Sequence, residues 1–159
     1  MEAQSQIYER LQSEGIELHL RTTPMGAYTP FVQTGNLLFV SGHIAKRGGV
    51  PWVGQLGTDM EAAVGFAAAR SVAADMLGTL QAATGDLNRI VRIVKVLCLV
   101  NSNPKFTDHH IVGNGFSELI ESIFGTSGKH ARSTFGVAQL PTGACVEVEL
   151  IAELRGGHA

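Results

Sequence analysis

The last strand-like segment of this chain, residues 145–154, has an apolar residue at every second position. These apolar residues are Val146, Val148, Leu150, Ala152 and Leu154, and glutamates occupy positions 147, 149 and 153. Because successive side chains of a β-strand point to opposite faces, a period of two predicts a strand with one buried side and one exposed side. The chain must therefore build a sheet that is covered on one face.

A second strand is predicted to begin near Arg132, and Leu-Pro-Thr-Gly at positions 140–143 predicts a turn between the two strands. Alternation from Arg132 places Thr134 and Gly136 on the same face. We expect Arg132 and the glutamates of the last strand to lie on one side. An arginine at the head of a strand is a good anchor for a carboxylate, and a nearby glutamate could handle a proton.

Two long helices are predicted in the middle of the chain. An alanine-rich run reaches Ala83 from Thr58-Asp-Met-Glu61, which has the form of a capping box, and Gly85 follows it. The second helix is predicted from apolar residues spaced i, i+3, i+4, i+7 and i+8, with Gly125 past its end. These residues are Phe116, Leu119, Ile120, Ile123 and Phe124.

Further strands are predicted at Glu17–Leu20, Leu37–Val40 and Ile90–Asn101, and a glycine-rich loop at residues 45–57. Within the third of these strands, a period of two places Arg92 and Lys95 on opposite faces. A short helical extension is expected over about residues 1–15, where it would cap an edge or a neighbouring subunit. Two long helices against one sheet indicate the α+β class.

The composition indicates one domain covering residues 1–159, because a chain of this length with 45% hydrophobic residues can bury a sizeable core. The formal net charge of −2 argues against a general attraction to nucleic acid or anionic membrane. No apolar stretch reaches the ~20 residues of a membrane helix, and the first ten residues lack the basic start and apolar run of a secretory signal, so we expect neither. We expect a cytoplasmic location, with Cys98 and Cys145 as buried free thiols.

Three motifs together resemble one known family. They are Gly26-Ala-Tyr28, Gly35-Asn-Leu-Leu-Phe-Val-Ser-Gly-His43 and the segment 129–149. In order and spacing they resemble the RidA/YjgF family of reactive-intermediate imine deaminases, historically described as L-PSP endoribonucleases. The resemblance implies a chorismate-mutase-like fold, with two long helices on one face of a mixed sheet, assembled as a homotrimer with inter-subunit clefts. It also implies cofactor-independent hydrolysis of 2-imino acids or enamines to 2-keto acids and ammonia.

The resemblance assigns roles to individual residues. Arg132 matches the arginine that holds the substrate carboxylate, and Glu147 matches the glutamate that activates water. Tyr28 matches a tyrosine of the site, and Gly42 matches the glycine whose carbonyl faces the substrate nitrogen. From the residues alone, a surface ion pair for Arg132 and a solvated position for Glu147 are open alternatives.

Three more positions are implied to bind substrate. Asn114 aligns with an asparagine near the family's ligand, although Asn-Gly is also common in turns. Thr134 replaces a frequent cysteine, so it can donate a hydrogen bond but cannot supply thiol chemistry. His43 replaces a frequent glutamine, which could alter the substrates that fit.

Other functions have weaker support in the residues. The histidines at positions 109, 110 and 130 show no zinc-ligand spacing, so neither a metal nor a cofactor is expected. One alternative is a trimer that binds small carboxylates without turnover, which Thr134 favours slightly. Another is an L-PSP-type endoribonuclease, which should need phosphate-binding residues beyond Lys46-Arg47 and Arg89.

Overall fold

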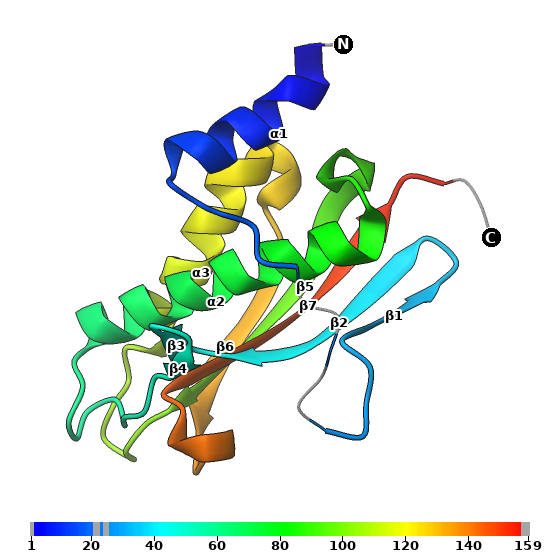
Figure 1. The fold of residues 1–159 in the computed structure, drawn as a ribbon. Helices are drawn as coiled ribbons and strands as arrows, with labels where there is room; N and C mark the ends of the chain where they lie inside the picture. Colours follow the sequence, from blue (N-terminus) through cyan, green and yellow to red (C-terminus); the bar gives the residue numbers. More distant parts are fainter. Residues whose placement is uncertain (1, 21–22, 24–25, 157–159) are drawn as a thin grey trace.

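The computed structural model describes residues 2–20, 23 and 26–156, with side chains from Gln6 onward. The helices are α1 (Glu2–Ser13), α2 (Ala62–Thr84) and α3 (His109–Phe124), with short 3₁₀ turns η1 (Leu87–Arg89), η2 (Gly125–Gly128) and η3 (Pro141–Gly143). The strands are β1 (Phe31–Thr34), β2 (Leu37–Ile44), β3 (Lys46–Arg47), β4 (Val50–Pro51), β5 (Ile90–Asn101), β6 (Ala131–Val137) and β7 (Val146–Leu154). Figure 1 shows α2 and α3 on the same side of the sheet.

The main sheet has the strand order β1-β2-β7-β5-β6, and β3 and β4 form a separate two-stranded ribbon. It is a mixed sheet, because β5 and β6 pair in parallel and the other neighbours pair antiparallel. Helix α2 packs over β2 and β7, and α3 packs over β5 and β6. The predicted arrangement of two long helices on one face of a mixed sheet is confirmed. We call the opposite face the open face.

The alternation of the last strand is confirmed, because every apolar position that defined it is buried in the core under the helices. The apolar stripe of α3 is also buried, and Gly125 caps that helix. Strand β5 and the end of α2 at Gly85 agree with the prediction as well. Cys98 and Cys145 are free, buried thiols, and burial raises their pKa values to about 12 and about 11.

The strands β6 and β7 are not neighbours, although a short turn, η3, lies between them in sequence. Strand β5 separates them, and its register places Arg132 opposite Val96 but Glu147 opposite Leu99. Val96 faces the helices and is fully buried, whereas position 99 alternates to the open face. The prediction that Arg132 and the glutamates share one side is therefore wrong.

The prediction that Arg92 and Lys95 point to opposite faces is also wrong. Arg92 pairs with Glu153 and Lys95 with Ile151, so both lie on the open face. The register shifts between Ile93 and Lys95, and such an irregularity resets the alternation that a regular strand would follow.

Three local predictions failed. Residues 17–20 form no strand but cross α2, with the carbonyl of His19 against Gly78. The capping box is absent, because Glu61 occupies the N-cap of α2 without a side-chain hydrogen bond. The Thr58 hydroxyl donates instead to Gln55 Oε1 (2.7 Å). The predicted loop at 45–57 contains the β3–β4 ribbon.

The predicted N-terminal helix is present as α1 and docks on the helices of its own chain. The hydroxyl of Tyr8 lies 2.8 Å from Gln81 Oε1, and Arg10 Nη1 donates to the carbonyl of Ile123 at the end of α3 (3.1 Å). Glu14 forms an ion pair with Arg70 of α2 (2.7 Å). Among the helices of the described residues, none has the length and apolar character needed to cross a bilayer.

Candidate functional site

One group of predicted site residues surrounds a cavity of about 370 Å³ beside β2. Strand β1 pairs with β2 only as far as Val40, and a register irregularity follows between Val40 and His43. Gly42 itself therefore has no paired residue in either neighbouring strand, while the preceding Ser41 N–H donates to the carbonyl of Pro30 (2.9 Å). Tyr28, Gly42 and Glu147 line the cavity together with Ser41 and Lys46.

The carboxylate of Glu147 lies directly against the backbone of Gly42. Any Cβ at position 42 would collide with Glu147 Oε1, so only glycine allows this contact. Burial of this half-buried carboxylate, and then the nearby charge of Glu149, raise its pKa above the ordinary value of 4.5. Within the described residues, Glu147 has neither a hydrogen bond nor an ion pair, so its oxygens are available to accept a proton.

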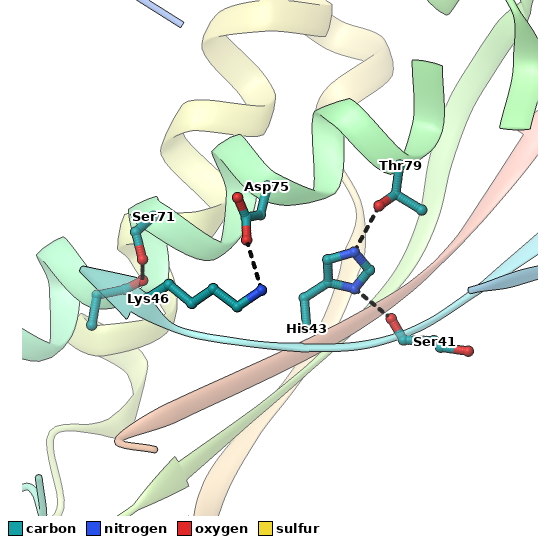
Figure 2. Close-up of polar contacts among 7 residues, drawn as sticks. Ser41, His43, Lys46, Ser71, Asp75 and Thr79 are labelled. Carbon is teal, nitrogen blue, oxygen red and sulfur yellow. Dashed lines mark hydrogen bonds and ion pairs between the residues drawn. The ribbon is translucent and has the colours of Figure 1, made fainter. Parts of the chain in front are cut away.

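The ring of His43 points toward α2, as Figure 2 shows. Its Nδ1 lies 2.8 Å from the carbonyl oxygen of Ser41, and its Nε2 lies 2.8 Å from Thr79 Oγ1. Because a carbonyl only accepts, Nδ1 carries a proton and donates it to Ser41. The imidazole thus fixes the strand segment that carries Gly42. Along the same helix, Lys46 Nζ lies 3.7 Å from Asp75.

The second group of predicted residues lies between β6 and α3. Arg132 Nη1 donates to Asn114 Oδ1 (3.1 Å) and to Ser117 Oγ (3.0 Å), and Nη2 donates to the carbonyl of His110 (3.3 Å). A guanidinium has five N–H donors, so these three bonds within the described chain leave two donors for a ligand. Two adjacent donors are what a bidentate carboxylate contact requires.

The absence of a side chain at Gly113 lets α3 approach these residues closely. A Cβ there would lie 2.9 Å from Thr134 Oγ1 and 3.1 Å from Arg132 Cζ. Thr134 Oγ1 is buried and has no hydrogen-bond partner among the described residues, which is uncommon for a hydroxyl. Arg132, Asn114 and Thr134 therefore gather at one place, and the Thr134 hydroxyl there has no hydrogen-bond partner among the described residues.

One chain does not bring the two groups together. Glu147 is on the open face, and Arg132 is on the helix-facing side of the sheet. Strand β5 lies between their strands, which separates them by roughly 10 Å across the sheet, and the register offsets them by roughly 10 Å along it. A small substrate within a single subunit cannot contact both residues.

A family model described as "YjgF/chorismate mutase-like, putative endoribonuclease" matches residues 8–154. The chain is 44% identical over 155 residues to Protein TCP17 of Trypanosoma cruzi, covering 96% of this chain and 97% of that protein. The chain belongs to the YjgF/RidA family. The family resemblance inferred from the three motifs is thus confirmed, and so is the chorismate-mutase-like fold.

Two solved structures are similar over nearly the whole length of this YjgF/RidA chain. The protein Atu1372 from Agrobacterium tumefaciens, described as having unknown function, is 37% identical with a TM-score of 0.87, covering 95% of this chain and 94% of its own. A "putative endoribonuclease" from Shewanella oneidensis is 31% identical with a TM-score of 0.88, covering 93% of this chain and 99% of its own.

Sequence reasoning missed two residues that contact the arginine group of this YjgF/RidA chain. Ser117 accepts from Arg132, and His130 lies behind Ser117 with its Nε2 2.9 Å from the hydroxyl. The spacing of Asn114 and Ser117 was a usable signal, because residues three apart share one face of a helix. His130 gave no such signal. Among the described residues, no three His, Cys, Asp or Glu side chains are grouped so that they could hold a metal ion.

Proposed function

We propose that this chain hydrolyses 2-imino acids or enamines without a cofactor, releasing ammonia and a 2-keto acid. The observation that carries the proposal is the hydrogen bonding of the Arg132 guanidinium. Its guanidinium is held by three hydrogen bonds to α3, and two of its donors remain for a carboxylate. A planar guanidinium can form two parallel hydrogen bonds to a substrate carboxylate, whereas the compact ammonium group of a lysine acts only as a point charge.

Glu147 and Gly42 supply the remaining chemistry. The carboxylate of Glu147 takes a proton from a water molecule as the water oxygen bonds to the imine carbon, and it then passes that proton to the imine nitrogen, which gives a carbinolamine. Transfer of the carbinolamine hydroxyl proton to the nitrogen, again through Glu147, forms the keto group and breaks the C–N bond, so that ammonia leaves and the carboxylate of Glu147 is restored. The Gly42 carbonyl would accept from the nitrogen, and Tyr28 bounds the same cavity. Imines hydrolyse unaided, so orientation and proton transfer are sufficient for catalysis.

This chemistry requires a second copy of the chain, because Arg132 and Glu147 of one subunit lie on opposite faces of the sheet. We propose a homotrimer in which Arg132 of one subunit faces the Glu147 cavity of the next. The open face supports assembly, since Val32, Phe39 and Phe135 on it are 55%, 42% and 47% exposed. An exposed apolar surface of this kind is typical of a contact face.

Light scattering coupled to size-exclusion chromatography is expected to give three times the mass of one chain at micromolar concentration. The physical reason is that burial of the apolar open face stabilises the assembly. A monomer under these conditions would contradict the inter-subunit site and the mechanism with it.

The endoribonuclease alternative has less support from the geometry, although the family description and several relatives carry that term. RNA cleavage should use basic residues around a groove. The three candidates are engaged within the chain instead: Lys46 lies near Asp75, Arg47 lies 5.3 Å from the centre of the Trp52 ring, and Arg89 donates to the carbonyl of Thr84 (3.1 Å).

Substituting Arg132 with lysine is expected to lower kcat/KM for imine hydrolysis roughly tenfold to a hundredfold. The charge is kept, but the bidentate donor pair is lost, which costs about 1.5–3 kcal/mol for hydrogen bonds to a charged group. The assay generates 2-imino acids in situ with an amino-acid oxidase and follows the release of keto acid at matched trimer content.

The matched control is Arg155→Lys, at an exposed arginine that follows β7. It makes the same chemical change far from both groups and is expected to leave the rate unchanged. An Arg132→Lys protein that is folded and fully active would contradict the catalytic assignment. Wild-type protein that binds 2-keto acids but hydrolyses none of several imino acids would instead favour the binding-only trimer.

A further inference from the structure

We propose that Ser117 and His130 are positioning residues for Arg132, and that carboxylate binding requires the neutral form of His130. This inference rests on the proposed function of Arg132 as the carboxylate anchor. It concerns residues that lie outside the group implied by the family resemblance.

A chain of three hydrogen bonds connects the backbone before β6 to the guanidinium. His130 Nδ1 lies 2.6 Å from the carbonyl oxygen of Gly128, His130 Nε2 lies 2.9 Å from Ser117 Oγ, and Arg132 Nη1 donates to that same oxygen (3.0 Å). With His130 neutral, each of these hydrogen bonds has one allowed direction. The Gly128 carbonyl can only accept, so Nδ1 holds the proton, and Nε2 of the neutral ring accepts the hydroxyl proton of Ser117. The oxygen of Ser117 is then left with its lone pairs directed at Arg132.

Ser117 controls the direction of the arginine fork. It is one helical turn beyond Asn114 on α3, and the two side chains hold the two hydrogens of Nη1 from the same face. If Ser117 no longer accepts, the guanidinium keeps its bonds to Asn114 and to the His110 carbonyl, but one hydrogen of Nη1 loses its partner. The direction of the two donors left for the ligand is then less firmly fixed, which weakens a bidentate contact more than a single one.

Protonation of His130 would disrupt this arrangement. A proton on Nε2 turns that atom into a donor toward Ser117 and places a second positive charge near Arg132. The Ser117 hydroxyl then loses the acceptor of its own hydrogen, and its oxygen is shared between two cations that repel each other. Burial lowers the pKa of His130, and the charge of Arg132 lowers it further, while the hydrogen bond to the Gly128 carbonyl and the charge of Glu121 of α3 offset only part of this decrease. A further charge near this site, Lys129, is paired with Glu121 (3.4 Å). The ring is therefore neutral at neutral pH and becomes charged only as the pH falls below the ordinary value of 6.5.

The test is a double-mutant cycle on full-length protein, with pyruvate as the carboxylate probe and titration calorimetry as the measurement. Ser117→Ala and His130→Phe are each expected to weaken binding about threefold to tenfold at pH 7.5, the worth of one hydrogen bond. The double variant should bind no more weakly than Ser117→Ala alone, because His130 acts through Ser117. Ser117→Thr keeps the hydroxyl and should restore most of the affinity.

The pH dependence separates positioning from a structural role. His130→Gln keeps an acceptor for Ser117 but does not titrate, so its affinity at pH 7.5 should be close to that of wild type. Between pH 7.5 and 5, the wild type should lose more affinity than His130→Gln. Glu147 titrates equally in both proteins, so the difference reports His130. Melting temperature and trimer content are measured for every variant.

The outcomes distinguish this inference from the proposed function. The inference is overturned if folded Ser117→Ala and His130→Gln bind pyruvate with the same affinity and the same pH dependence as the wild type. In that case Arg132 can still be the residue that binds the carboxylate. Additive losses in the double variant would show that His130 acts independently of Ser117, which also overturns it. Wild type that binds no 2-keto acid at all would overturn the proposed function and the inference together.

Discussion

Replacing Glu147 with glutamine is expected to slow imine hydrolysis about a hundredfold or more, the usual contribution of a positioned general base. Glutamine has nearly the same shape and can still pack against Gly42, but its amide cannot take a proton from water. The change should therefore act on kcat, with little loss of affinity for the 2-keto product. The oxidase-coupled assay gives the rate, and calorimetry with pyruvate gives the affinity.

The decrease of activity at low pH provides a second test of Glu147 as the general base. The active form of a general base is the carboxylate, so activity falls as the pH drops through the pKa of Glu147. Burial and Glu149 raise that pKa above 4.5, and the loss should therefore begin at a higher pH than for an ordinary carboxyl. Glu149→Gln removes the neighbouring charge and should move the acid limb to lower pH. Full activity in Glu147→Gln would exclude this residue as the base.

Replacing Val148 with aspartate is expected to abolish folding. Val148 is fully buried on the helix-facing side of β7, in register with Cys98, which is also fully buried. An unpaired carboxylate there would cost about 4 kcal/mol or more, a large part of the ~5–15 kcal/mol that stabilises a typical domain. Thermal unfolding followed by circular dichroism should show no cooperative transition.

Glu149→Gln is the matched control, because residue 149 is exposed on the other face of the same strand. Its effect on the free energy of unfolding should stay within about 0.5 kcal/mol, as for most surface substitutions. Equal melting temperatures for Val148→Asp and Glu149→Gln would contradict the assignment of the two faces.

Local periodicity was enough to predict the elements that carry the core. The spacing of Phe116, Leu119 and Ile120 identified the buried face of α3, and the alternation along β7 identified the buried face of the sheet. The three motifs led to the correct family, and they contain most of the residues proposed for the two groups of the candidate site. Each of these patterns lies within ten or twenty consecutive residues. They could be recognised from the sequence because the residues that share one face of a helix or strand are close together along the chain.

The prediction for residues 17–20 failed because an extended segment becomes a strand only if another strand offers it hydrogen bonds. In the folded chain, this segment instead lies across α2, where His19 contacts Gly78. The capping box at Thr58 failed for a related reason. The loop before α2 folds on itself through Gln55 and Asp59, so the helix starts later than the local pattern indicated.

The sequence by itself determined the buried faces of α3 and β7, the family, and the first set of residues proposed for each half of the candidate site. Only the tertiary structure decided that β5 lies between β6 and β7, and hence that Arg132 and Glu147 face opposite sides of the sheet. Strand order depends on contacts between distant segments, and a single irregularity moves the following side chains to the other face. For the same reason, only the packing of α3 against β6 could bring Ser117 and His130 to Arg132.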